Sequence, residues 1–360
     1  MISKKALAGH GMILLFITVL MAIMVSACEL PGRSDSGDAA ERISGDADGV
    51  LPESEQPPSG DMAPEDEFAV QGPIDGAMIE EMPIRAIAVT VDNYKLARPQ
   101  TGLDKADLVY EIPVEGGITR YLAIFFHGQA DVIGPIRSAR PYLIDLAREW
   151  DAVYIHVGQS PQAQVYFKNG KIAHINQMYH SSGFWRDKAR KAPHNLYSDT
   201  KDLWDEIVKL GWDKKAEITG YKFRAADESF SGEIATELTI PYQYGDVGYR
   251  YDETAGMYLR SLNDSPYKDL ASDARLAAAN VLVQQVSVRS FDAEGRLVID
   301  LIGEGDALLF SEGHVQKGSW KKTSVTSRTV FYDVSGAEMR MKTGQTWIQL
   351  VPGWVQVRYR

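Results

Sequence analysis

The sequence predicts an α/β domain over residues 83–215 followed by a mostly antiparallel β domain over residues 216–360. Three observations support this division. Up to about residue 215, apolar β-type runs alternate with amphipathic helical segments, which is typical of a layered α/β domain. From about residue 221, short β-type runs are separated by glycine-containing turns, as in antiparallel hairpins. Residues 29–82 are rich in Gly, Ser, Pro and acids, so they offer little to a core.

The N-terminus has the pattern of a lipoprotein signal peptide. Lys4 and Lys5 precede an apolar run over residues 12–24, which is too short for a permanent membrane-spanning helix. Val25-Ser26-Ala27 then leads to Cys28, the one cysteine of the chain, in a pattern that resembles a bacterial lipobox. We therefore predict a signal peptide over residues 1–27 and lipidation of Cys28. We further predict a disordered acidic tether over residues 28–82 and a location on the outer face of the cell membrane.

The charge distribution argues against a nucleic-acid partner. The chain carries a net charge of −11, but twelve acids and two arginines between residues 29 and 70 account for most of it. The predicted folded part is therefore close to neutral and shows no basic excess. The single cysteine also excludes an intramolecular disulfide and a CxxC metal site.

The α/β domain is predicted from four strands and three helices. β-Type runs occupy residues 84–91, 106–114, 119–126 and 152–157, and the third is apolar on both faces, as in a central strand. Apolar residues at helical spacing predict helices over residues 141–150, 160–167 and 200–210. Pro141 and Ser160-Pro161 fit the first turns of the first two helices. In the β domain, residues 272–279 are predicted as a helix-like break between hairpins.

Two basic segments are the candidate binding residues. Arg137, Ser138 and Arg140 stand at the predicted start of the first helix, where a cation is unfavourable without an anionic partner. Either a ligand or a carboxylate such as Asp145 or Glu149 is expected to supply that charge. The second segment, residues 184–195, adds Arg186, Arg190, His194 and Asn195. A further candidate is Arg120, on the strand that follows a Gly-Gly turn.

Acidic residues near the strand ends admit two interpretations. Asp92, Glu111 and Glu115 could hold a divalent cation such as Mg²⁺, or they could form ion pairs with the arginines. We expect ion pairs. The histidines lack a zinc-ligand spacing such as HExxH, so no cofactor is predicted under this interpretation.

Several motifs resemble those of the YerB-type lipoproteins of Gram-positive bacteria, a two-domain family without an assigned activity. The resemblance spans nearly all of the chain after the tether and implies a lipid-anchored, extracytoplasmic protein. It is carried by VDN at 91–93, RPQTGL at 98–103, ADLVYE at 106–111, EGGITR at 115–120, GPIRSARP at 134–141, APHNLY at 192–197, ANVLV at 279–283 and GQTW at 344–347.

Three functional hypotheses follow. The leading one is a non-enzymatic lipoprotein that binds an anionic cell-envelope ligand, bearing phosphate or carboxylate, through an arginine-lined cleft. The second is a metal-dependent phosphotransferase, because the arrangement of strands, arginine-bearing loop and helix is similar to that of the LytR–CpsA–Psr proteins. That similarity implies Mg²⁺, arginines that stabilise the phosphate, and a lipid-linked precursor or cell-wall glycopolymer as partner. The third is a scaffold for another envelope protein.

Overall fold

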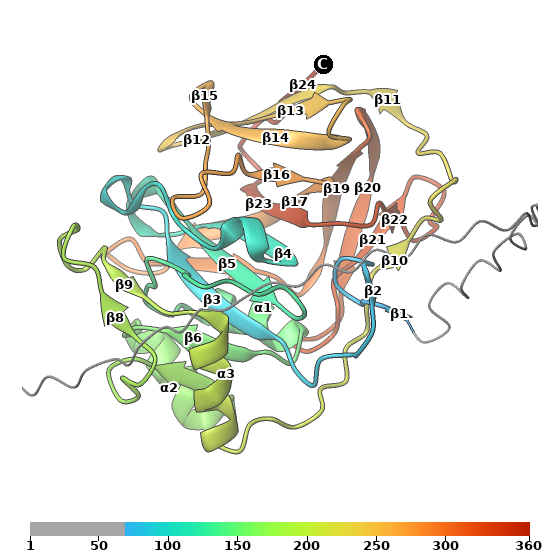
Figure 1. Ribbon diagram of the computed structural model, residues 1–360. Helices are drawn as coiled ribbons and strands as arrows, with labels where there is room; N and C mark the ends of the chain where they lie inside the picture. Colours follow the sequence, from blue (N-terminus) through green and yellow to red (C-terminus); the bar gives the residue numbers. More distant parts are fainter. Residues whose placement is uncertain (1–68) are drawn as a thin grey trace, which may run out of the picture. The chain divides into compact units, whose positions relative to one another are not determined.

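A mixed sheet of twelve strands forms the centre of the part of the chain that the computed structural model describes, residues 69–360 (Figure 1). The order of its main strands is β11 (Glu233–Ile234), β20 (His314–Lys322), β19 (Gly303–Ser311), β17 (Asn280–Ser290), β23 (Thr346–Pro352), β4 (Leu108–Pro113), β5 (Thr119–Phe125), β3 (Ile87–Asp92), β6 (Val153–His156) and β7 (His174–Asn176). Two further strands attach to it, β18 (Leu297–Asp300) beside β17 and β21 (Val330–Asp333) beside β20.

The four predicted strands of the α/β domain are confirmed as β3, β4, β5 and β6. Every residue of β3, β4 and β5 is buried, so these strands are covered on both faces, as the continuous apolar runs predict. β3 pairs antiparallel with β5 and parallel with β6. The carboxyl ends of β3 and β6 therefore lie at the same edge of the sheet.

Strands of both predicted domains share this sheet. β23 lies between β17 and β4 and is parallel to both. The α/β character of the N-terminal half and the mostly antiparallel β character of the C-terminal half are both confirmed. The division of the chain at residue 216 into two domains stays a prediction, because the hydrogen bonding between β4 and β23 runs across it.

A second, antiparallel sheet of six strands covers one face of the large one, and lies at the top in Figure 1. Its strands are β15 (Ser265–Pro266), β14 (Met257–Leu262), β13 (Gly245–Asp252), β12 (Glu237–Tyr242) and β24 (Arg358–Tyr359), with β16 (Ala277–Ala278) beside β14. The side chains of Val109, Tyr121 and Trp347 point to this face. Their neighbours Tyr110 and Leu122 point to the other, as the alternation of a strand requires.

The three predicted helices are confirmed as α1 (Pro141–Glu149), α2 (Pro161–Asn169) and α3 (Thr200–Lys209). α1 buries Leu143, Leu146 and Trp150 against the face opposite the six-stranded sheet. Full burial of such side chains contributes about 1.5–3 kcal/mol each. The Ser160 hydroxyl caps α2 by accepting a hydrogen bond from the Ala163 N–H at 3.2 Å.

Short elements complete the described residues. They are the paired strands β1 (Val70–Gln71) and β2 (Met78–Ile79), β8 (Trp185–Arg186) and β9 (Leu196–Tyr197), β10 (Lys222–Phe223) and β22 (Arg340–Met341), and the 3₁₀ turns η1 (Lys95–Ala97), η2 (Leu103–Lys105) and η3 (Glu115–Gly117). Among residues 69–360, no helix has both the length and the apolar character needed to cross a bilayer.

Two predictions of local structure need correction. Residues 272–279 are not helical, because Asp273 has a φ of +54° and the chain then extends into β16. The ordered body also begins before residue 83. β1 and β2 form a hairpin within the predicted tether, and Ile74 between them is 1% exposed, so this stretch does contribute to a core. The predicted signal peptide, Cys28 and the tether up to residue 68 lie outside the described residues.

Candidate functional site

Three arginines converge where β3 ends and β5 begins. Asp92 is the last residue of β3 and lies opposite Arg120 in the antiparallel pairing with β5. The segment before α1 runs beside β3, with the Arg137 N–H donating to the Thr90 carbonyl at 2.9 Å. Arg140 is the N-cap residue of α1. We call Asp92, Glu115, Arg120, Arg137, Arg140 and His194 the Asp92 cluster.

Asp92 contacts a histidine and an arginine in this cluster. Its Oδ2 lies 2.6 Å from His194 Nδ1 and 3.1 Å from Arg137 Nε. Its Oδ1 accepts a hydrogen bond from the Tyr94 N–H at 3.0 Å. The Tyr94 ring stacks on the imidazole of His194 with 4.9 Å between ring centroids. Both oxygens of this buried carboxylate are therefore occupied.

Glu115 and Arg140 form a bidentate pair. Arg140 Nε lies 2.5 Å from Glu115 Oε1, and Nη2 lies 3.1 Å from Oε2. Burial opposes ionisation of Glu115, but the hydrogen bonds and charge of Arg140 outweigh it and lower the pKa of the carboxyl group. The arginines at the start of α1 are thus balanced by Asp92 and Glu115, and not by Asp145 or Glu149. Glu149 instead accepts from Lys322 Nζ at 2.6 Å.

Arg120 lies between these two pairs. Its Nη1 donates to the backbone carbonyl of Ser138 at 3.0 Å, so Ser138 contacts the cluster through its main chain. Burial, together with the nearby charge of Arg140, lowers the pKa of Arg120 to about 10. Its Nε is buried without a hydrogen-bond partner among the described residues. Three guanidinium groups therefore face two carboxylates, before any charge on His194 is counted.

The remaining basic candidates shape the loop that presents His194. Arg186 Nη1 donates to Asn195 Oδ1 at 2.9 Å, and Asn195 Nδ2 donates to the carbonyls of Asp187 and Arg190. Arg190 binds the carbonyls of Ala97 and Pro99 at 2.6 and 2.7 Å. These contacts are within the protein, so Arg186, Arg190 and Asn195 fix the loop instead of lining the cluster.

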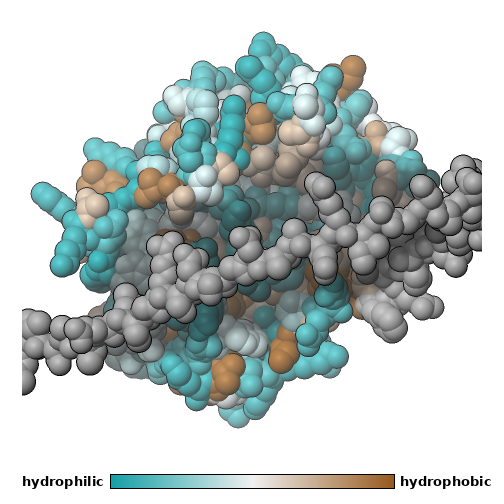
Figure 2. Space-filling model, in the orientation of Figure 1, coloured by the Kyte–Doolittle hydropathy of each residue, from teal (hydrophilic) through white to brown (hydrophobic). Residues whose placement is uncertain are grey.

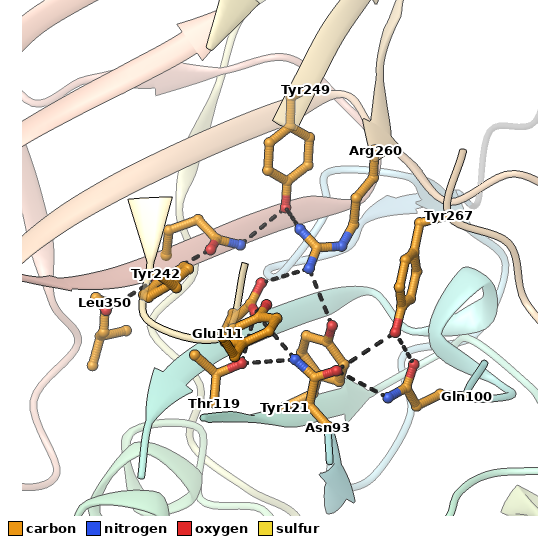
Figure 3. A network of polar contacts seen from close by, with 12 residues as sticks. Asn93, Gln100, Glu111, Thr119, Tyr121, Tyr242, Tyr249, Arg260, Tyr267 and Leu350 are labelled. Carbon is orange, nitrogen blue, oxygen red and sulfur yellow. Dashed lines mark hydrogen bonds and ion pairs between the residues drawn. The ribbon is translucent and has the colours of Figure 1, made fainter. Parts of the chain in front are cut away.

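Glu111 does not join the Asp92 cluster. It lies inside β4, and its Oε2 is 2.9 Å from Nη2 of Arg260 on β14 (Figure 3). Arg260 also donates to the hydroxyls of Tyr121 and Tyr249, both at 3.1 Å. Burial opposes the charge of Arg260, but Glu111 together with the nearby tyrosines outweighs it and raises the pKa of the guanidinium. This network was not predicted from the sequence, although Arg260 stands at an inward position of an alternating strand, between Tyr258 and Leu262.

A second histidine–aspartate group lies elsewhere in the N-terminal half. His127 Nε2 is 2.9 Å from Asp75 Oδ2 and 2.8 Å from Asp107 Oδ1. Hydrogen bonds to Asp107 and, to a lesser extent, to Asp75 raise the pKa of His127 to about 10. The two carboxylates thus stabilise the protonated imidazolium form of His127. Within residues 69–360, Asp75, Asp107 and His127 are the set of three His, Cys, Asp or Glu side chains that lie close enough together to ligate one metal ion. By contrast, Asp92, Glu111 and Glu115 are each paired with an arginine.

Comparisons with known proteins agree with this architecture. Residues 75–213 match the family described as "Protein of unknown function (DUF3048) N-terminal domain", and residues 238–348 match its C-terminal domain. The chain is 33% identical over 301 residues to "Putative lipoprotein YerB" of Bacillus subtilis, covering 81% of this chain and 89% of that protein. The crystal structure of YerB from the same organism has a TM-score of 0.73 at 32% identity, over 80% of this chain and 99% of the other. The chain therefore belongs to the DUF3048 family and is similar over most of its length to YerB of Bacillus subtilis.

Proposed function

We propose that this protein is a lipid-anchored, extracytoplasmic lipoprotein that binds an anionic cell-envelope component at the Asp92 cluster. The anchor is supported by Cys28 in its lipobox-like setting and by the name of the Bacillus subtilis relative. Two signals, such as two acyl chains, are needed for durable attachment to a membrane.

One observation carries the binding proposal: three guanidinium groups share one cluster with only two carboxylates. The positive charges of neighbouring guanidinium groups repel each other. The charge of Arg140 therefore adds to the effect of burial in lowering the pKa of Arg120. An anion would relieve it. The side chains of Arg137 and Arg140 are 23% and 15% exposed, so both can be reached from solvent. Their planar groups match phosphate and carboxylate oxygens.

The phosphotransferase alternative has less support. In that mechanism Asp92 or Glu115 would hold Mg²⁺, which prefers carboxylate and water oxygens. Both carboxylates are engaged by arginines, and Asp92 also by His194. A metal would have to displace these partners. The scaffold alternative would be favoured by a large apolar patch, whereas the face seen in Figure 2 is mostly hydrophilic with small separate hydrophobic spots.

The test is anion binding by the wild type and by an Arg137→Gln/Arg140→Gln variant. The probes are inorganic phosphate, glycerol 3-phosphate, glucose 1-phosphate and citrate, measured by calorimetry and by melting temperature. We expect the double variant to lose about 1.5–3 kcal/mol of binding free energy for each charge-assisted contact removed, at least about tenfold in affinity.

Arg358→Gln is the matched control, since Arg358 forms an exposed pair with Asp246. It should bind the probes as the wild type does. A wild type that responds to none of the four anions contradicts the proposal. Equal losses in the double variant and in Arg358→Gln would also contradict it, because they would indicate a general charge effect.

A further inference from the structure

One histidine and two aspartates meet from three separate segments of the N-terminal half. Asp75 lies between β1 and β2, Asp107 directly precedes β4, and His127 follows β5. Their donor atoms all lie within 4.8 Å of one another. The three residues are far apart in the sequence, so no short zinc-binding motif reveals them. None of them belongs to the Asp92 cluster, and they therefore form a separate candidate site.

A single proton does not satisfy this arrangement fully. His127 Nε2 lies 2.9 Å from Asp75 Oδ2 and 2.8 Å from Asp107 Oδ1. Nε2 carries at most one hydrogen, so it cannot donate a linear hydrogen bond to both oxygens. A metal ion instead binds several donor atoms at once.

The distances between the donor atoms suit a zinc ion. Two nitrogen or oxygen ligands about 2.0–2.1 Å from zinc, with an angle of about 90–110° between them, lie about 2.8–3.4 Å apart. The observed distances of 2.9 and 2.8 Å are at the short end of that range. Small outward shifts of the side chains therefore admit the ion.

The backbone holds both carboxylates in position. Asp75 Oδ1 accepts a hydrogen bond from the Ala77 N–H at 3.1 Å. Asp107 Oδ2 accepts from the N–H groups of Phe126 and Gly128, at 2.5 and 3.2 Å. Each aspartate thus anchors one oxygen to the main chain and turns the other toward the imidazole. Outer hydrogen bonds of this kind orient carboxylates that ligate a metal.

His127 gives the site its access to solvent. Its side chain is 29% exposed, whereas those of Asp75 and Asp107 are 10% and 2% exposed. It also lines a cavity of about 540 Å³ formed by residues 81–85, the end of β5 and the start of α3. The imidazole is therefore the ligand that can swing aside to admit an ion, and the water beside it can supply further ligands.

The donor set selects the class of metal. Mg²⁺ and Ca²⁺ prefer sites made only of oxygen atoms, and soft ions prefer sulfur. Zn²⁺ accepts carboxylate and imidazole ligands together, and three protein ligands leave one position for water. We propose that Asp75, Asp107 and His127 bind one Zn²⁺ ion. The proton on His127 Nε2 passes to solvent as the zinc–nitrogen bond forms.

The experiment measures metal binding by the full, untagged chain after treatment with a chelator and removal of the chelator. Calorimetry with ZnCl₂, MgCl₂ and CaCl₂ should show one Zn²⁺ per chain and no binding of Mg²⁺ or Ca²⁺. His127→Gln and Asp75→Asn should each weaken Zn²⁺ binding by at least about tenfold, since loss of even an outer contact to a ligand has that effect. X-ray absorption should show one imidazole and only light ligands, without the zinc–sulfur distance of about 2.3 Å that binding to Cys28 would give.

His180→Gln is the matched control, because His180 Nδ1 lies 3.4 Å from a single carboxylate, that of Glu206. It should bind Zn²⁺ as the wild type does, and so should the Arg137→Gln/Arg140→Gln variant, which separates this site from the anion site. Melting curves without zinc show whether each ligand variant folds.

Four outcomes would overturn the proposal: no Zn²⁺ binding by the wild type, a zinc–sulfur distance, an equal loss of affinity in His180→Gln, or unchanged affinity in a folded ligand variant. Should neither ligand variant fold, the absorption spectrum decides. Zinc held elsewhere by oxygen alone would lack the scattering of an imidazole ring, and that result would also overturn the proposal.

Discussion

Glu111 and Arg260 form an ion pair that is closed to solvent, with 2.9 Å between Oε2 and Nη2 and side chains 0% and 1% exposed. Glu111 belongs to the N-terminal half and Arg260 to the six-stranded sheet of the C-terminal half. The rings of Trp347 and Tyr267 lie 4.9 and 5.3 Å from the guanidinium carbon. One charge pair therefore joins the two sheets inside the core.

Arg260→Met should destabilise the protein by about 3–5 kcal/mol, because it leaves the Glu111 carboxylate buried without its counter-charge. Adding Glu111→Gln to that variant should restore part of the loss, since no unpaired charge then remains. Urea unfolding measures both effects. Arg358→Met, at an exposed pair, is the control and should change stability by about 0–1 kcal/mol. A similar small change for Arg260→Met would show that the buried pair does not contribute as described.

His127 should make stability fall in alkaline solution. Its pKa is raised to about 10 in the folded state by Asp107 and Asp75, against about 6.5 for an unperturbed imidazole. The folded state therefore binds this proton more tightly. The resulting stabilisation is complete below about pH 6.5 and is lost between about pH 6.5 and pH 10. Urea midpoints across this range should decline less in His127→Gln than in the wild type. His180→Gln, whose imidazole is more exposed, should keep the decline; equal slopes in both variants would refute the assignment.

Asp145→Asn should stabilise the protein near neutral pH. Burial raises the pKa of Asp145 to about 6, despite the opposing charges of Arg148 and Lys322 and the hydrogen bond from Tyr166. The folded state therefore binds this proton more tightly than the unfolded chain, and stability falls as pH rises from about 4 to about 6. Thermal melts at acid and neutral pH should show that fall in the wild type and a smaller one in Asp145→Asn. A lower melting temperature for Asp145→Asn than for the wild type at neutral pH would contradict the prediction that the ionised Asp145 destabilises the folded state.

A chain that stops at residue 215 should aggregate instead of folding alone. It would lack β23, so β4 in the middle of the sheet would present an unpaired edge. Size-exclusion chromatography of residues 69–215 and of residues 69–360 makes the comparison. A monomeric 69–215 fragment with a cooperative melt would instead support an independent α/β domain.

Cys28→Ala should abolish the membrane anchor and leave the protein either in the medium or as an unprocessed precursor. The side chain that receives the lipid would be missing. Cell fractionation and labelling with a radioactive fatty acid measure this directly. Ser26→Ala retains the cysteine and should remain labelled. Label that persists in Cys28→Ala would contradict the lipobox assignment.

The sequence predicts local structure well where neighbouring residues decide it. Leu143, Leu146 and Trp150 at helical spacing after Pro141 fix α1, and Ser160-Pro161 fixes the start of α2. Residues 272–279 show the limit of such patterns. Their alanines suit a helix, but the turn at Asp273 and the pairing of β16 with β14 override that preference.

Contacts between distant segments could not be predicted in the same way. The ion-pair partners of Arg137 and Arg140 depend on where η3 and the end of β3 lie, which the spacing of the arginines does not encode. Asp145 and Glu149, the partners expected from the sequence, are near the arginines along the chain, but on α1 Asp145 accepts from the Tyr166 hydroxyl and Glu149 pairs with Lys322. The parallel pairing of β4 with β23 likewise cannot be predicted from the sequence of either strand, because any strand buried on both faces has the same apolar pattern.

The pairing of β4 with β23 also sets when the molecule can fold. Leu108 pairs with Thr346, so the centre of the sheet closes only when almost the whole chain is present. Such distant contacts make folding slow, because a long loop must close before its contacts form. A chain that crosses a membrane from its N-terminus would remain without its central pairing until residue 352 had emerged. In the export that we propose for this protein, the sheet would therefore close only when translocation is nearly complete, and the chain would stay unfolded at its centre until then.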